Sequence, residues 1–186
     1  TAVDDSEETL EDVAVIIDVR GNDTDPNNPT EDLTIGSFVS PNGTVEDNGD
    51  GTVTFTPEFN FNGEATFTYV VTDPDGQSDE GEVTVNVIPV NDAPVANDDD
   101  AETTEGVPVI VDLRGNDTDV ETPTADLVIS DMTSPDGMVV DNGDGTVTFT
   151  PADGFTGAAT ITYTVSDPDG GSDMGTATVA VNDPVD

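Results

Sequence analysis

The sequence predicts an all-β protein built from two tandem seven-stranded β-sandwiches with Greek-key connections. The first observation is an internal repeat: Gly21–Asp25 recurs as Gly115–Asp119, and Asp73–Gly76 recurs as Asp167–Gly170. The second is a series of short segments rich in valine and threonine, several of which alternate apolar and polar residues. The third is that clusters of Gly, Pro, Asn and Asp bound these segments. Repetition of one domain-sized unit favours an array with a mechanical or adhesive role.

The 186 residues are enough for two domains of ordinary size. The second copy aligns with the first, without a gap, over residues 2–85. We therefore expect one sandwich at residues 1–90, a linker at residues 91–95 and a second sandwich at residues 96–186. The segment around this linker contains two prolines, so it should be stiffer than a Gly/Ser tether.

Seven strands are predicted in each repeat, and no segment offers ten residues of helical periodicity. The β-branched and aromatic residues of these segments favour extended backbone, and the turn formers between them end each strand. Seven short strands in a domain of this size are typical of an immunoglobulin-like sandwich, although the Cys and Trp core residues of antibody domains are absent. In repeat 1 the expected strands are Ala2–Glu7, Val13–Val19, Leu33–Ile35, Thr44–Asp47, Thr52–Thr56, Ala65–Val71 and Glu82–Val87.

Charge excludes several classes of function. The chain has 42 Asp and Glu residues but only 2 Lys and Arg, giving a formal net charge of −40. Such a protein repels nucleic acid and anionic membranes, so we expect neither nucleic-acid binding nor direct membrane contact. There is no Cys for a disulfide or thiolate site and no His for general-base catalysis or zinc binding.

The acids are expected to gather at one end of each sandwich. Successive turns of an antiparallel sandwich alternate between its two ends. In repeat 2 the second, fourth and sixth turns should therefore share the end where the first strand begins, which itself contributes Asp98–Asp100. These turns are Asn116–Asp126, Asp141–Gly145 and Asp167–Asp173.

Crowded carboxylates favour a hard cation. Two like charges about 4 Å apart repel by about 1 kcal/mol in water and about 4 kcal/mol at an effective dielectric constant of 20. Calcium accepts six to eight oxygen ligands and removes that repulsion, and a donor set of oxygens without imidazole or thiolate favours it over transition metals. Asp47–Gly51 and Asp141–Gly145 have a plainer interpretation as hairpin turns, because Asn and Gly tolerate positive φ.

The linker and the acidic loops of the repeats resemble those of a known family. Pro89–Pro94 is similar to the Asp-x-Asn-Asp-Asn-Ala-Pro linker of cadherins, and Asp23-Thr24-Asp25 is similar to their Asp-x-Asp pair. The whole repeat resembles the cadherin-like tandem repeats of large bacterial RTX-type adhesins. Here the linker departs from the family pattern at Pro89 and Ala93, and we expect only one or two calcium ions per junction.

The resemblance implies a set of calcium ligands. Between the repeats it would comprise Glu11, Asn91, Asp92, Asp117, Asp119 and Asp167, with Asp126 as an additional ligand. Equivalent residues at the outer ends of the two repeats are Asp23, Asp25 and Asp73 at one end and Glu105 and Asp183 at the other.

Two residue types in the repeats are expected to be structural. Arg20 and Arg114, the only cations, stand beside the Asn-Asp-Thr-Asp loops and should each pin a neighbouring carboxylate, with a glycan contact as the functional alternative. Tyr69 and Tyr163 lie on predicted strands and are expected in the core or at a corner rather than as sugar-binding platforms.

The leading functional hypothesis is a calcium-stiffened extender module of a secreted or surface-anchored bacterial adhesin, and therefore an extracellular protein. Its partners would be neighbouring repeats, extracellular polysaccharide or another adhesin. Two alternatives remain: a calcium-dependent polysaccharide-binding (carbohydrate-binding) module, and a homophilic cell–cell adhesion module. Catalysis is not expected, because the acids recur in both repeats and lie in turns instead of a substrate cleft.

Overall fold

A computed structural model describes residues 1–184 of the chain. It divides into two compact units, Thr1–Val90 and a second unit that begins at Asn91. The residues predicted as a linker are bonded to the second unit: the Asn91 side chain donates to Asp167, and Val95 forms an isolated antiparallel bridge with Thr118. We call the two units repeat 1 and repeat 2.

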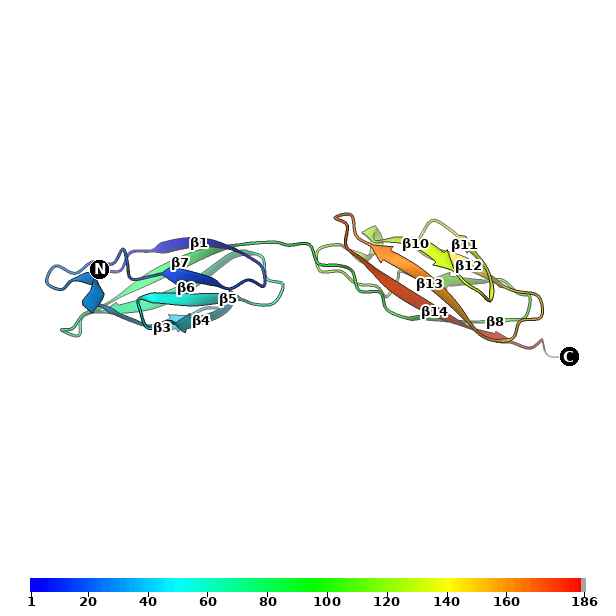
Figure 1. Cartoon of the computed structure of the whole chain (residues 1–186), viewed down its shortest axis with the longest axis horizontal. Coiled ribbons are helices and arrows are strands. Elements are labelled where there is room, and N and C mark those ends of the chain that lie inside the picture. Colours follow the sequence, from blue (N-terminus) through cyan, green and yellow to red (C-terminus); the bar gives the residue numbers. More distant parts are fainter. Residues whose placement is uncertain (185–186) are drawn as a thin grey trace. The chain divides into compact units, whose positions relative to one another are not determined.

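Each repeat is a sandwich of one four-stranded and one three-stranded sheet (Figure 1). In repeat 1 the sheet orders are β1-β7-β6-β3 and β2-β5-β4, and only the β1–β7 pair is parallel. The non-consecutive neighbours are the crossovers of a Greek-key fold. The strands are β1 (Asp5–Leu10), β2 (Val15–Asp18), β3 (Thr34–Val39), β4 (Gly43–Asp47), β5 (Thr52–Pro57), β6 (Gly63–Thr72) and β7 (Ser78–Ile88), with a short 3₁₀ helix η1 (Thr30–Asp32).

Repeat 2 reproduces this arrangement with sheets β10-β13-β14-β8 and β11-β12-β9 (Figure 1). Its parallel pair is β8–β14. The all-β, two-sandwich prediction is therefore confirmed. The strands are β8 (Asp99–Thr104), β9 (Val109–Asp112), β10 (Val128–Thr133), β11 (Gly137–Asp141), β12 (Thr146–Pro151), β13 (Gly157–Ser166) and β14 (Ser172–Asn182), with the 3₁₀ helix η2 (Thr124–Asp126).

The alternation seen in the sequence places one face of each strand in the core. Along β6, Ala65, Phe67, Tyr69 and Val71 are buried, whereas the residues between them are partly exposed. Each repeat has its own cluster of buried apolar residues. Tyr69 and Tyr163 are 0% and 1% exposed, as expected for core residues.

The first strand was predicted too early. The sequence favoured Ala2–Glu7, but β1 runs from Asp5 to Leu10 because its parallel register with β7 pairs Asp5 with Val83 and Leu10 with Ile88. This pairing is a tertiary contact that the acidic segment does not reveal by its own composition.

Contacts within each repeat define two poles. We call the end where β1 or β8 begins the proximal pole; in repeat 1 the Val3 N–H donates to Asp23 there. The opposite end is the distal pole, where the Glu11 N–H donates to Ile88 at the end of β7. The predicted separation of the turns into two groups is therefore present in the fold.

Close packing makes one glycine necessary beside each buried tyrosine. A Cβ atom added at Gly175 would lie 2.1 Å from Cζ of Tyr163. We predict that Gly175→Ala displaces this ring and destabilises repeat 2 by about 1–3 kcal/mol, the usual cost of overpacking. Thermal unfolding measures the loss; an unchanged melting temperature for repeat 2 would contradict it.

Candidate metal centre

Asp117 occupies the centre of the proximal pole of repeat 2. It lies in the loop after β9 and is 1% exposed. Its Oδ1 accepts the Asn97 N–H at 2.8 Å and the Tyr163 hydroxyl at 3.4 Å. Its Oδ2 is buried and has no hydrogen-bond partner among residues 1–184.

Asp119 is held by its own loop. Its Oδ1 accepts the backbone N–H groups of Glu121 and Thr122 at 3.1 and 2.6 Å. Within the described part of the chain, its buried Oδ2 has no partner. The loop thus fixes the direction of the carboxylate and leaves one oxygen unpaired.

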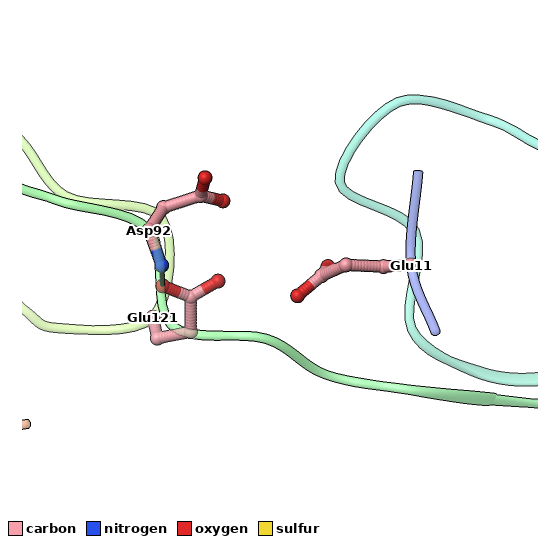
Figure 2. Close-up of side chains that lie close together, drawn as sticks. All are labelled: Glu11, Asp92 and Glu121. Carbon is pink, nitrogen blue, oxygen red and sulfur yellow. Dashed lines mark hydrogen bonds between the residues drawn. The ribbon is translucent and has the colours of Figure 1, made fainter. Parts of the chain in front are cut away.

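Asp92 and Glu121 are neighbours at this pole. The Asp92 N–H donates to Glu121 at 3.1 Å, and a carboxylate oxygen of one residue lies within 4.8 Å of one of the other (Figure 2). Asp92 Oδ2 is also buried and unpartnered among the described residues. Sequence reasoning missed Glu121, because its counterpart in repeat 1 is Asn27 and the repeat pattern gave no signal.

Asp167 closes the site from the turn after β13. Its Oδ1 accepts three backbone N–H groups, those of Asp169, Gly170 and Gly171, at 2.6–2.9 Å. Its Oδ2 accepts the side-chain amide of Asn91 at 2.9 Å. The Asn91 hydrogen bond and these backbone donors lower the pKa of Asp167, so the carboxylate is ionised at neutral pH.

One pattern is common to three of these carboxylates. Asp117 and Asp119 each anchor Oδ1 on backbone N–H groups, and Asp92 is anchored through its own backbone. Each of the three keeps a buried oxygen without a partner in the described structure. Such oxygens are costly unless protons or a cation satisfy them. The donor set is entirely oxygen, which fits a hard divalent cation such as Ca²⁺.

Repeat 1 carries the equivalent acids at its own proximal pole, although none of them keeps a buried oxygen without a partner among the described residues. Asp23 accepts the Val3 N–H at 2.8 Å, Asp25 accepts Asn27 and Asn28 N–H groups at 2.8 Å, and Asp73 accepts Gln77 N–H at 2.8 Å. Asp25 and Asp73 both line a pocket of about 300 Å³. The three predicted residues therefore gather at one pole in repeat 1 as well.

Comparison with known proteins identifies the domains. A family model described as a cadherin-like domain matches residues 90–182, half of the chain. The chain belongs to the cadherin-like domain family. A second model, for a bacterial Ig domain, matches residues 1–86. Cadherin-like and bacterial Ig domains are typically extracellular. No curated protein sequence matches the chain.

Solved cadherin ectodomains resemble this cadherin-like protein in fold. Human CDH23 EC21-23 has a TM-score of 0.56 at 16% identity, with 96% of this chain and 72% of that chain covered. Drosophila N-cadherin EC1-4 has a TM-score of 0.55 at 16% identity, with 99% of this chain and 48% of that chain covered. The human desmocollin-1 ectodomain has a TM-score of 0.53 at 14% identity, with 97% of this chain and 39% of that chain covered. The chain thus spans about two-fifths of the desmocollin-1 ectodomain.

The other predicted ligands of the cadherin-like repeats each have their own place within a repeat. Glu11 and Glu105 are at the distal poles of their repeats, where each donates its N–H to the end of the last strand. Glu11 is 4% exposed, and its side chain extends from the first turn (Figure 2). Asp126 is exposed at the end of η2, and Asp183 is exposed at the position that Pro89 has in repeat 1.

The two arginines are structural, but within residues 1–184 their side chains bind backbone carbonyls and not the predicted carboxylates. In repeat 2, Arg114 donates to the backbone carbonyls of Leu127 at 3.2 Å and Asp144 at 2.8 Å. Arg20 makes the same bonds to Leu33 and Asp50. The guanidinium therefore ties the hairpin between β11 and β12 to the loop before β10.

A buried tyrosine sits between two acids at each proximal pole. The Tyr163 hydroxyl lies 3.2 Å from Asp99 Oδ2 and 3.4 Å from Asp117 Oδ1, and Tyr69 lies similarly between Asp5 and Asp23. One hydroxyl proton cannot satisfy two carboxylates at once. Burial raises the pKa of Asp5 and of Asp99 to about 6, and it also raises the pKa of Asp117.

These raised values predict an unusual pH dependence without calcium. An unfolded aspartate has a pKa of about 3.9, so the folded protein binds protons more tightly between about pH 6 and pH 4. Lowering the pH from about 7.5 to about 5.5 in chelator should therefore raise the melting temperature by a few degrees. Asp5→Asn/Asp99→Asn should remove most of this rise, and a melting temperature that falls with pH in the parent protein would refute the assignment.

No helix in residues 1–184 is long and apolar enough to cross a membrane.

Proposed function

We propose that this cadherin-like pair is a calcium-stiffened extender module of a secreted or surface-anchored bacterial adhesin. It acts outside the cell, has no catalytic role, and separates a binding domain from the cell surface. Calcium would bind where one repeat joins the next. The observation that carries the proposal is the set of buried carboxylate oxygens of Asp92, Asp117 and Asp119, which have no hydrogen-bond partner within the described residues.

Chain connectivity supports a contribution from repeat 1 to the same ion. The Val90 N–H donates to Glu11, and Val90 is bonded covalently to Asn91, whose side chain binds Asp167. Glu11 is thereby tied to the residue that directly precedes the ligand set of repeat 2. An ion that takes oxygens from both repeats would restrict their relative motion, whereas the uncompensated acids would repel one another.

Calcium affinity is expected in the range of extracellular modules, with Kd of about 10⁻⁴–10⁻³ M. The module would remain empty at low intracellular calcium and become occupied after secretion. Mg²⁺ is a poor substitute, because it requires a rigid octahedron and retains its waters.

Distances between spin labels test the stiffening directly. The chain has no Cys, so Glu46→Cys and Val140→Cys, at equivalent exposed positions on β4 and β11, give one label per repeat. We predict a broad distance distribution in EGTA and a narrow one in calcium. Equal widths in both buffers would overturn the proposal.

A pair of matched variants assigns the effect to the junction. Asp117→Asn/Asp167→Asn should abolish the narrowing, because it removes two charges from the ligand set of repeat 2. Asp23→Asn/Asp73→Asn makes the same change at the proximal pole of repeat 1, which is not at this junction, and should leave the narrowing intact.

A further inference from the structure

Two turns at the distal pole of repeat 1 share an uncommon backbone conformation. The Val13 N–H closes one turn on Leu10, and the Phe61 N–H closes the other on the Glu58 carbonyl. The third residue of each turn is left-handed although it is not glycine: φ is 58° at Asp12 and 56° at Asn60. Left-handed backbone is unfavourable for residues with a Cβ, although Asp and Asn tolerate it better than most.

Repeat 2 builds the same two turns with glycine. The Val107 N–H donates to Thr104, and the Phe155 N–H donates to Ala152. Their third residues are Gly106 and Gly154, with φ of 69° and 74°. Glycine takes this conformation without steric cost, so the fold itself does not need Asp or Asn at these positions.

The side chain in repeat 1 provides a bond that glycine cannot. The backbone N–H of Asn60, which a glycine would also have, donates to Asp12 Oδ1 at 2.9 Å, so the Asp12 carboxylate links the two turns. Asp12 directly follows Glu11, whose N–H donates to Ile88 and whose Oε1 accepts the Val90 N–H. Three contacts therefore fix the backbone and carboxylate of Glu11.

The corresponding glutamate of repeat 2 lacks two of these contacts. Gly106 has no carboxylate to link the turns, and Pro184, which replaces Val90, has no N–H to donate. Only the N–H bond of Glu105 to Asn182 is retained. The two distal poles share their backbone path but differ in how firmly they hold the glutamate.

We infer that Asp12 is a positioning residue for a calcium ligand at Glu11, and that the distal pole of repeat 1 binds calcium more tightly than that of repeat 2. This inference rests on the proposed function. The buried Glu11 Oε2 has no hydrogen-bond partner in the described structure, and the linked turns hold it in place before the ion arrives. Supporting contacts of this kind typically change metal affinity by 10–100-fold.

The test replaces Asp12 by the glycine that repeat 2 has at the same position. Asp12→Gly should leave the melting temperature in EGTA unchanged or raise it by a few degrees, because glycine removes the left-handed strain. Calorimetric titration should show calcium binding weakened by about tenfold. Both proteins should carry Asp23→Asn/Asp73→Asn, so that the proximal site of repeat 1 does not contribute heat.

The opposite pattern would overturn the inference: a lower melting temperature in EGTA with unchanged calcium affinity means that the turns are merely structural. Ser37→Gly is the matched control, since Ser37 has φ of 57° on the edge strand β3 and should not change calcium affinity. If the parent protein binds no calcium, the proposed function fails together with the inference. If the parent binds calcium and the Asp12→Gly variant binds it equally well, only the inference fails.

Discussion

Removing calcium is expected to lower the melting temperature of each repeat by about 10–20 °C. A ligand present at about 100 times its Kd stabilises the folded form by about 2.7 kcal/mol, and 1 kcal/mol shifts the melting temperature of a domain of this size by about 4–8 °C. In repeat 2 the physical reason is the buried oxygens of Asp117 and Asp119, which have no hydrogen-bond partner among the described residues. In repeat 1 it is the repulsion among the acids of its proximal pole. Without an ion their desolvation and mutual repulsion oppose folding.

Scanning calorimetry in excess calcium and in EGTA measures this difference. Two transitions are expected if the repeats unfold independently, and both should shift, because each has its own proximal set of acids. Magnesium at the same concentration is the control for ionic strength and should restore little of the stability. Overlapping thermograms in calcium and EGTA would contradict the proposed role of the ion.

The second large effect is that Asp117→Asn shifts the melting temperature of repeat 2 in opposite directions in EGTA and in calcium. In EGTA, Asp117→Asn should raise the melting temperature of repeat 2, because it removes a buried charge while its amide oxygen still accepts the Asn97 N–H. In calcium the same variant loses a ligand. The stabilisation of repeat 2 by calcium should then shrink from about 10–20 °C to a few degrees.

A control separates this effect from net charge. Asp100→Asn removes the same charge from an exposed position on β8, and it should change the melting temperature little in either buffer. A structural role for Asp117 without metal predicts destabilisation in both buffers. A lower melting temperature in both buffers would therefore contradict the assignment of Asp117 as a calcium ligand.

The sequence predicted the architecture because the strands carry their own signal. Alternating Val, Thr and aromatic residues in Thr52–Thr56 and Ala65–Val71 place one face in the core wherever the strand pairs. The error at the first strand has the opposite origin. β1 is acidic, and only its parallel pairing with β7 determines that it starts at Asp5.

The candidate site was predicted in part for a related reason. Asp117, Asp119 and Asp167 lie in loops whose equivalents recur in repeat 1, so the repeat marks them. Glu121 has no acidic counterpart and was missed. Burial of Tyr163 was predicted, but its contact with Asp99 and Asp117 was not, because that contact joins residues from three separate strands and loops.

Comparison of repeat 1 with repeat 2 reveals a role for the Asp12 turn that neither repeat shows alone. The turns containing Asp12 and Asn60 look ordinary in sequence, since both residues are common in turns. Only the glycine at the same position of repeat 2, together with the hydrogen bond between the two turns of repeat 1, indicates that the Asp12 side chain has a use beyond folding.

Calorimetric titration of calcium into chelator-stripped protein measures whether the acidic poles bind the ion. We predict saturable binding with Kd near 10⁻⁴–10⁻³ M, and fewer ions bound to Asp117→Asn/Asp167→Asn than to the parent chain. A titration without binding heat, or with the same number of ions in both proteins, would contradict it.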